Sequence, residues 1–240
     1  MKNTDPTVEN WDREWKIYSR KPFFKPNLKV ITVICQTFSN KLKGEKILEL
    51  GAGSGCDILS LAKKGAEAYA IDFSLQSIKT INYWSKRMRV KITAKRADIK
   101  KIPFPNNYFN MVYSVGLMEH FKNYLSLIKE QIRVIKPGGF LLVDVPQKFT
   151  LYTVAKHLRM KLGSHPFGWE IEYSKNELIQ LAKKLNQEVY QIYGRESDII
   201  SRFPAFIRPI GYRFFSKHIE NSFLSPYVSL CIGIILKVKK

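Results

Sequence analysis

The stretch that decides the fold is KILELGAGSG at residues 46–55. Its first five residues predict a short buried strand, the glycine-rich remainder a loop, and residues 57–64 a helix that Gly65 ends. Closely spaced glycines let a backbone turn tightly and approach a ligand, as a nucleotide-type loop requires. A dinucleotide site would prefer the spacing GxGxxG. Here the third glycine comes one residue early and Glu49 precedes the first, which disfavours a phosphate ligand.

Predicted strands and helices alternate along the chain around this loop. Further strands are predicted at residues 68–71, 90–97, 111–115, 140–145, 188–193 and 230–238, and helices at 28–38, 75–86, 124–135 and 175–185. Ser74 is a candidate cap for the second of these helices, and Ser174 with Glu177 forms a capping box for the last. This alternation is typical of an α/β fold, with a parallel sheet covered by helices on both faces.

Three segments lie outside the regular alternation. Trp11, Trp15 and Tyr18 share one face of a predicted amphipathic helix, so residues 1–43 are expected to form a helical N-terminal extension. Residues 44–240 are expected to form one domain that carries two inserts. The first, at about 147–173, is too long for a plain connection and is predicted to be a lid. The second, at about 198–227, is basic and aromatic.

Composition narrows the classes of partner and compartment. The 240 residues include 40 Lys and Arg against 20 Asp and Glu, and the resulting net charge of +20 should attract nucleic acid, an anionic membrane or a phosphorylated substrate. The three cysteines show no CxxC spacing, which argues against a disulfide scaffold or a zinc site. The N-terminus lacks the apolar core of a signal peptide, and the apolar run at 228–236 is too short to span a bilayer. A cytoplasmic protein is therefore expected.

Two further acids come at predicted strand ends. Asp72 ends the second strand, where a carboxylate can accept both hydroxyls of a ribose, although a lone acid there can equally cap a helix. Asp98 follows the third strand and can meet an exocyclic amine beside the apolar residues at 102–105. Together with Glu49, these acids indicate a ligand with a cationic or hydroxyl-rich body.

Four motifs carry a resemblance to a known family: ILELGAGSG at 47–55, AIDFS at 70–74, ADIKKIPFPNNYFNMVYSVGLMEHF at 97–121 and RVIKPGGFLLVDVPQ at 133–147. In this order and spacing the chain resembles class I S-adenosylmethionine-dependent methyltransferases, in the small-molecule branch of the ubiquinone/menaquinone and methyltransferase type 11 kind. The resemblance implies a Rossmann-like, doubly wound, seven-stranded sheet whose last strand is antiparallel. It also implies S-adenosylmethionine as the cofactor.

The resemblance also assigns cofactor contacts. It places the glycine loop against the methionine tail, Asp72 at the ribose, Asp98 and Ile99 at the adenine, and Val115 with Gly116 as the wall beside the sulfonium. The implied cofactor-binding residues are Glu49, Gly51, Ala52, Gly53, Gly55, Asp72, Phe73, Asp98, Ile99, Val115 and Gly116. A metal site is not expected, because Glu119 and His120 are adjacent and no third ligand has a usable spacing.

Residues after the fourth and fifth strands are expected to contact the methyl acceptor. Methyl transfer from an activated donor needs chiefly alignment, but a hydroxyl acceptor would benefit from a general base. His120 is the candidate base, with packing or a structural hydrogen bond as the alternative. The expected substrate-side residues are Glu119, His120, His165, Trp169 and Tyr173.

The predicted function is methyl transfer to a small or lipidic, amphiphilic acceptor, with O-, N- and C-methylation left open. An anionic membrane surface is an expected partner, and no obligate protein partner is evident. A tRNA or rRNA methyltransferase is the main alternative. Base methylation is disfavoured because the chain lacks the Asp-Pro-Pro-aromatic type of loop after the fourth strand and a suitably placed nucleophilic cysteine. A non-catalytic cofactor-binding protein of the same fold is a second alternative.

Overall fold

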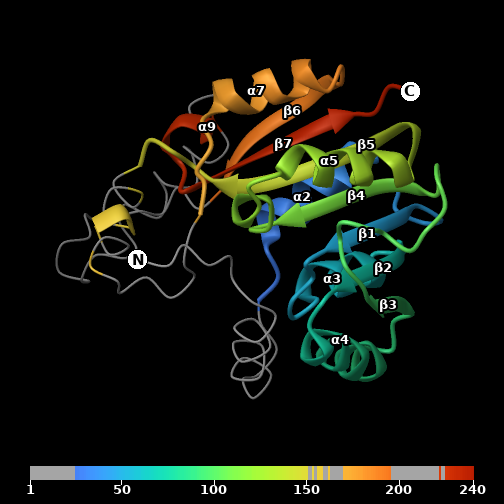
Figure 1. Ribbon diagram of the computed structural model, residues 1–240. Coiled ribbons are helices and arrows are strands. Elements are labelled where there is room, and N and C mark those ends of the chain that lie inside the picture. Colours follow the sequence, from blue (N-terminus) through green and yellow to red (C-terminus); the bar gives the residue numbers. More distant parts are fainter. Residues whose placement is uncertain are drawn as a thin grey trace.

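The computed structural model describes residues 25–150, 153, 156–158, 162, 170–195, 222 and 225–240. They form one seven-stranded sheet in the order β3-β2-β1-β4-β5-β7-β6 (Figure 1). The strands are β1 Lys46–Leu50, β2 Glu67–Asp72, β3 Ile92–Arg96, β4 Phe109–Val115, β5 Ile135–Pro146, β6 Glu188–Arg195 and β7 Cys231–Lys237. Strand β7 runs antiparallel to both β5 and β6, while β1 to β5 pair in parallel. The predicted Rossmann-like sheet with an antiparallel last strand is confirmed.

The helices begin and end close to the predicted positions. They are α2 Leu28–Thr37, α3 Cys56–Lys63, α4 Leu75–Met88, α5 Tyr124–Val134, α7 Lys175–Lys184 and α9 Ser225–Val228, with a 3₁₀ turn, η1, at Met118–His120. The side chain of Ser74 caps α4 by accepting from the Ser77 N–H. Ser174 and Glu177 form the complete capping box of α7. Side chains that satisfy the first N–H groups of a helix fix where it starts, which is why both starts could be predicted.

Alternate residues of the central strands build two apolar layers, one on each face of the sheet. Leu48 and Leu50 of β1 pack in the layer that includes α5 and α7. Ile47 packs in the opposite layer, against buried residues of α2, α3 and α4. Figure 1 shows α5 in front of β4 and β5, with α2 behind them. The sheet is therefore doubly wound, and its loops at the carboxyl ends of the strands stay available for a site.

The helical segment before the first strand contributes to the same core. Val30 and Ile34 of α2 are fully buried, in one cluster with Ile47 of β1 and Ile235 of β7. The helix expected within residues 8–20 lies outside the described residues. The boundary between an extension at 1–43 and a domain at 44–240 stays a prediction. Helix α2 belongs to the expected extension, and it covers one face of the sheet.

Strand β5 starts earlier than predicted. The sequence predicts a helix to residue 135 and a strand from 140, whereas β5 starts at Ile135, with a register shift against β4 between Phe109 and Met111. Two glycines make the irregular start possible. Gly138 has a φ of +76°, and a Cβ on Gly139 would lie only 2.7 Å from the Asn110 carbonyl oxygen. Glycine in a strand often marks such a shift.

The first insert leaves and rejoins the sheet at one place. Gln147 and Tyr173 form a bridge, the Lys148 N–H donates to the Tyr173 carbonyl, and the Tyr173 N–H donates to the Pro146 carbonyl. Residues 153 and 156–158 of this insert are helical. Most of the second insert, at 198–227, lies outside the described residues. In the part of the chain that is described, no helix is long and apolar enough to cross a membrane.

A buried ion pair joins strands β5 and β6. Asp144 of β5 is fully buried, and its Oδ1 accepts from Nη2 of Arg195 on β6 at 2.7 Å. The phenol of Tyr193 donates to the other carboxylate oxygen at 3.0 Å. Because β7 lies between β5 and β6, these side chains connect strands that do not pair directly.

We expect Arg195→Met to lower the free energy of unfolding by about 3 to 5 kcal/mol, because it leaves the Asp144 carboxylate buried without its cation. Urea denaturation measures this loss. The control is Lys148→Met, which breaks a pair with Glu177 whose two side chains are 43% and 40% exposed. That change should cost less than about 1 kcal/mol. Equal losses for the two variants would contradict the role given to the Asp144–Arg195 pair.

Candidate functional site

The glycine loop after β1 adopts a conformation that favours glycine. Gly51, Gly53 and Gly55 have φ angles of +63°, +52° and +72°, all in the left-handed region. The Gly51 N–H donates to the Ile71 carbonyl at 2.9 Å, which holds the loop against the end of β2. The loop therefore presents closely packed backbone, without side chains at three of its positions, at the carboxyl edge of the sheet.

Asp72 ties this loop to the next one. Its carboxylate is buried at the end of β2, and one oxygen accepts from the Gly53 N–H at 2.8 Å. The other oxygen accepts from the Ser74 N–H at 2.8 Å, at the start of α4. Asp72, which is predicted to bind the ribose, therefore also fixes the glycine loop relative to α4.

Glu49 lies on β1 just before the loop, and its side chain contacts α3. One of its carboxylate oxygens accepts from the Ile58 N–H at 3.2 Å, and the side chain is buried. Burial raises the pKa of the Glu49 carboxyl well above its usual range, and the nearby charge of Asp57 raises it further. A cationic group bound nearby would favour the ionised form of this carboxyl.

The loop after β3 combines a polar and an apolar residue. Asp98 is exposed, and one of its carboxylate oxygens accepts from the Lys100 N–H at 2.9 Å. Ile99 beside it is buried, while Phe73, after β2, is half-buried and its carbonyl accepts from the Arg96 guanidinium at 2.8 Å. An accessible carboxylate next to an apolar side chain fits a flat ring with an exocyclic amine, as predicted for these positions.

The turn after β4 completes this edge of the sheet. Gly116 is exposed, has a φ of +64°, and donates its N–H to the Asp144 carbonyl at 3.0 Å, while Val115 is half-buried. A Cβ on Gly51 would come 2.9 Å from the Leu117 side chain, so the loop after β1 and the turn after β4 are in contact. The predicted cofactor residues from β1 and β4 therefore lie side by side.

The predicted acceptor residues that the structure describes are brought together beside this turn. Glu119 and His120 are buried in η1, and the Glu119 carbonyl accepts from the Ile171 N–H at 3.0 Å, two residues from the buried Tyr173. Burial raises the pKa of the Glu119 carboxyl to about 8, helped by the charges of Glu170 and Asp144. The other two predicted substrate residues, His165 and Trp169, lie outside the described residues.

The sequence analysis missed an ion cluster behind Glu119. The ammonium of Lys156 is almost fully buried and lies 2.7 Å from Glu170 Oε2 and 2.5 Å from Glu172 Oε1. Glu172 Oε2 lies 3.1 Å from Nε2 of His157. The paired residues are 14 or more positions apart within an irregular insert, so no local pattern signals their pairing.

The described residues fit the cofactor that the resemblance implies. Left-handed glycines give close access to the backbone, Gly116 is exposed at the end of β4, and Asp98 offers an accessible carboxylate beside Ile99. Glu119 Oε2 is buried and has no hydrogen-bond partner among the described residues. Within the same residues, no three His, Cys, Asp or Glu side chains are grouped as metal ligands.

Comparison with known proteins agrees with this geometry. Residues 48–143 match the family described as a methyltransferase domain. The chain is 24% identical over 187 residues to the ubiquinone biosynthesis O-methyltransferase of Pelagibacter ubique, covering 75% of this chain and 77% of that one. It is 25% identical over 214 residues to the phthiotriol/phenolphthiotriol dimycocerosates methyltransferase of Mycobacterium leprae, covering 85% and 72%.

A solved structure shares the whole fold. The chain matches one from the Haloferax volcanii complex with the Trm112 methyltransferase activator with a TM-score of 0.67 at 13% identity, covering 97% of this chain and 96% of that chain. This likeness extends the fold match beyond residues 48–143. With the family match and the relatives above, it leads to one classification. Residues 48–143 form a methyltransferase domain, and the chain is an S-adenosylmethionine-dependent methyltransferase.

We expect Asp72→Asn to weaken binding of S-adenosylmethionine by roughly 10- to 150-fold, because hydrogen bonds to a charged group are worth about 1.5 to 3 kcal/mol. Isothermal titration calorimetry measures the affinity. Glu67→Gln is the matched control, because Glu67 is exposed at the opposite end of the same strand. Equal affinity of Asp72→Asn and the wild type for S-adenosylmethionine would show that Asp72 does not bind the cofactor.

Proposed function

We propose that this methyltransferase acts on a small or lipidic acceptor that has an apolar body and one polar reacting group. The relatives described above are named for ubiquinone biosynthesis and for phthiotriol dimycocerosates, which are quinone and lipid substrates. The proposal takes that class of acceptor, and leaves the particular compound open.

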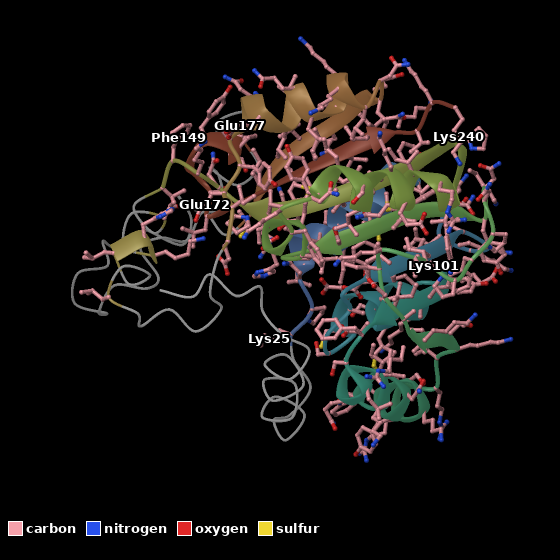
Figure 2. All side chains as sticks on the ribbon, in the orientation of Figure 1. Lys25, Lys101, Phe149, Glu172, Glu177 and Lys240 are labelled. Carbon is pink, nitrogen blue, oxygen red and sulfur yellow. The ribbon has the colours of Figure 1, made fainter. Side chains whose placement is uncertain are left out.

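The observation that carries the proposal is apolar exposure beyond the carboxyl end of β5. Phe149, Leu158 and Leu162 of the first insert are 73%, 59% and 73% exposed. Figure 2 shows Phe149 at the same end of the molecule as Glu172, opposite Lys240. Exposed apolar side chains grouped near a site favour an apolar ligand or surface. An amphiphilic acceptor could therefore enter with its apolar body against the insert.

Within this proposal the cofactor contacts follow the sequence prediction. Asp72 would hold the ribose, Asp98 and Ile99 the adenine, and the glycine loop the methionine tail. Val115 and Gly116 would form the wall beside the reacting centre. The bound cofactor supplies an activated methyl group, so the side chains of this enzyme need chiefly to position the acceptor and exclude water.

We also propose that the enzyme is cytoplasmic and works at the surface of an anionic membrane. The net charge of +20 supports this, because each cation near an anionic surface contributes about 1 kcal/mol of attraction. Lys148 is exposed next to Phe149, so cationic and apolar side chains occur together at the insert. RNA would use the same cations, and the experiment below includes it as a competing acceptor.

We expect labelled methyl groups from S-adenosylmethionine to appear in an organic extract when the enzyme meets quinone precursors and lipids in anionic vesicles. Phe149→Ser with Leu162→Ser should raise KM for the vesicle-borne acceptor by about 10-fold or more, because two exposed apolar contacts are lost. Val189→Ser, which removes an exposed valine of β6, is the control and should leave KM unchanged. Label in bulk RNA, with none in the extract, would overturn the proposed acceptor class.

A further inference from the structure

Two buried polar atoms of the predicted acceptor residues have no hydrogen-bond partner among the described residues. They are Oε2 of Glu119 and the phenol oxygen of Tyr173. Their residues are only 3% and 6% exposed. Buried polar groups are normally paired, because an unpaired one loses its bonds to water and gains nothing in return. Two such atoms together indicate a place where a polar ligand group binds.

The two side chains belong to one local structure. The Ile171 N–H donates to the Glu119 carbonyl, so the chain that leads to Tyr173 runs beside η1. Burial is the largest cause that raises the pKa of the Tyr173 phenol, and the neighbouring Tyr124 and Glu119 raise it further. The two groups are therefore close enough to interact electrostatically.

Glu119 also borders the turn after β4. A Cβ built on Gly116 would lie 3.6 Å from Oε1 of Glu119, which is ordinary van der Waals contact. Gly116 is exposed and belongs to the proposed wall beside the reacting methyl group. A ligand atom that meets Glu119 is thus at the position where the acceptor must be.

We propose that Glu119 is the general base of the reaction, and that it removes the proton of an acceptor hydroxyl which the Tyr173 phenol holds in place. The inference rests on the proposed function and deepens it, because it makes the acceptor an acidic hydroxyl such as a phenol or enol. The enzyme is then an O-methyltransferase. His120, the base that the sequence suggests, is not needed for this step.

The proton and electron balance of this step is complete. The acceptor oxygen donates an electron pair to the methyl carbon and forms the new C–O bond. The carbon–sulfur bond breaks, and its electron pair stays on sulfur, which becomes a neutral thioether. The hydroxyl proton moves to Oε2 of Glu119 and later passes to water. The phenol of Tyr173 keeps its proton and donates a hydrogen bond to the acceptor oxygen throughout.

The surroundings of Glu119 suit a base for a weakly acidic hydroxyl. Its pKa of about 8 lies closer to that of a phenol, about 10, than an ordinary carboxylate does, which favours proton transfer. The ammonium of Lys156, which pairs with two glutamates, lowers this pKa, but burial and the charges of Glu170 and Asp144 outweigh its effect. Among the described residues, the charged groups that act on Glu119 are Asp144 on β5 and Glu170 and Lys156 of the first insert. His120 follows Glu119 in η1, Tyr173 packs against Tyr124 of α5, and Lys156 also pairs with Glu172.

The test compares Glu119→Gln with His120→Gln in full-length enzyme, with a phenolic acceptor identified by the label experiment. Glu119→Gln should lower kcat by about 100- to 10,000-fold and change affinity for S-adenosylmethionine by less than about 3-fold. In the wild type and in His120→Gln, kcat/KM should rise with pH and level off near pH 8. Tyr173→Phe should keep this profile and lower kcat, because it removes only the hydrogen bond.

A second measurement follows the Glu119 proton without turnover. Infrared spectra of the cofactor-free enzyme should show a protonated carboxyl band that disappears with a midpoint near pH 8 and is missing in Glu119→Gln. An absent band, or a pH profile that Glu119→Gln leaves intact, overturns the inference. Transfer to an amine or carbon of an amphiphilic acceptor would overturn it as well, while the proposed acceptor class would stand. Transfer to RNA alone would overturn both.

Discussion

The carboxylate of Asp72 is the constraint on which the site depends. By accepting from the N–H groups of Gly53 and Ser74, it fixes the loop after β1 against the start of α4. This is possible because β1 and β2 are parallel neighbours, so both carry their loops at the same edge of the sheet. The chain after β1 turns to the face covered by α2 and α3, and the chain after β4 turns to the face covered by α5. The crevice between β1 and β4 is the switch point at which such folds bind ligands.

Much of this arrangement could be predicted from sequence, because local rules determine it. Glycines at alternate positions after the segment KILEL at 46–50 predict strand and loop, and the serine caps set the starts of α4 and α7 within one residue. The order of the four motifs then predicts the seven-stranded sheet with an antiparallel last strand. Asp98 also follows the third strand, as predicted, and the structure leaves it exposed beside the buried Ile99. These features depend on neighbours within a few positions, so a single sequence contains the information.

Features that depend on distant residues could not be predicted. Arg195 neutralises Asp144 across 51 positions, and Lys156 meets Glu170 and Glu172 only because the insert closes on itself at Gln147 and Tyr173. The unusual proton affinity of Glu119 comes from burial and from charges on other elements, so the sequence analysis chose His120 as the base instead. The predicted start of β5 was wrong for a similar reason, because the close approach of Gly139 to Asn110 is a tertiary contact.

Hydrogen exchange of the backbone amides, with and without S-adenosylhomocysteine, tests the location of the cofactor site most directly. The account predicts slower exchange in residues 51–55, 72–74, 97–101 and 115–120 when the ligand is bound. Residues 136–139, at the opposite end of the sheet, should exchange at the same rate in both states. Calorimetric binding without slower exchange in the first four segments, or with slower exchange only elsewhere, would contradict a cofactor site at the carboxyl edge of the sheet.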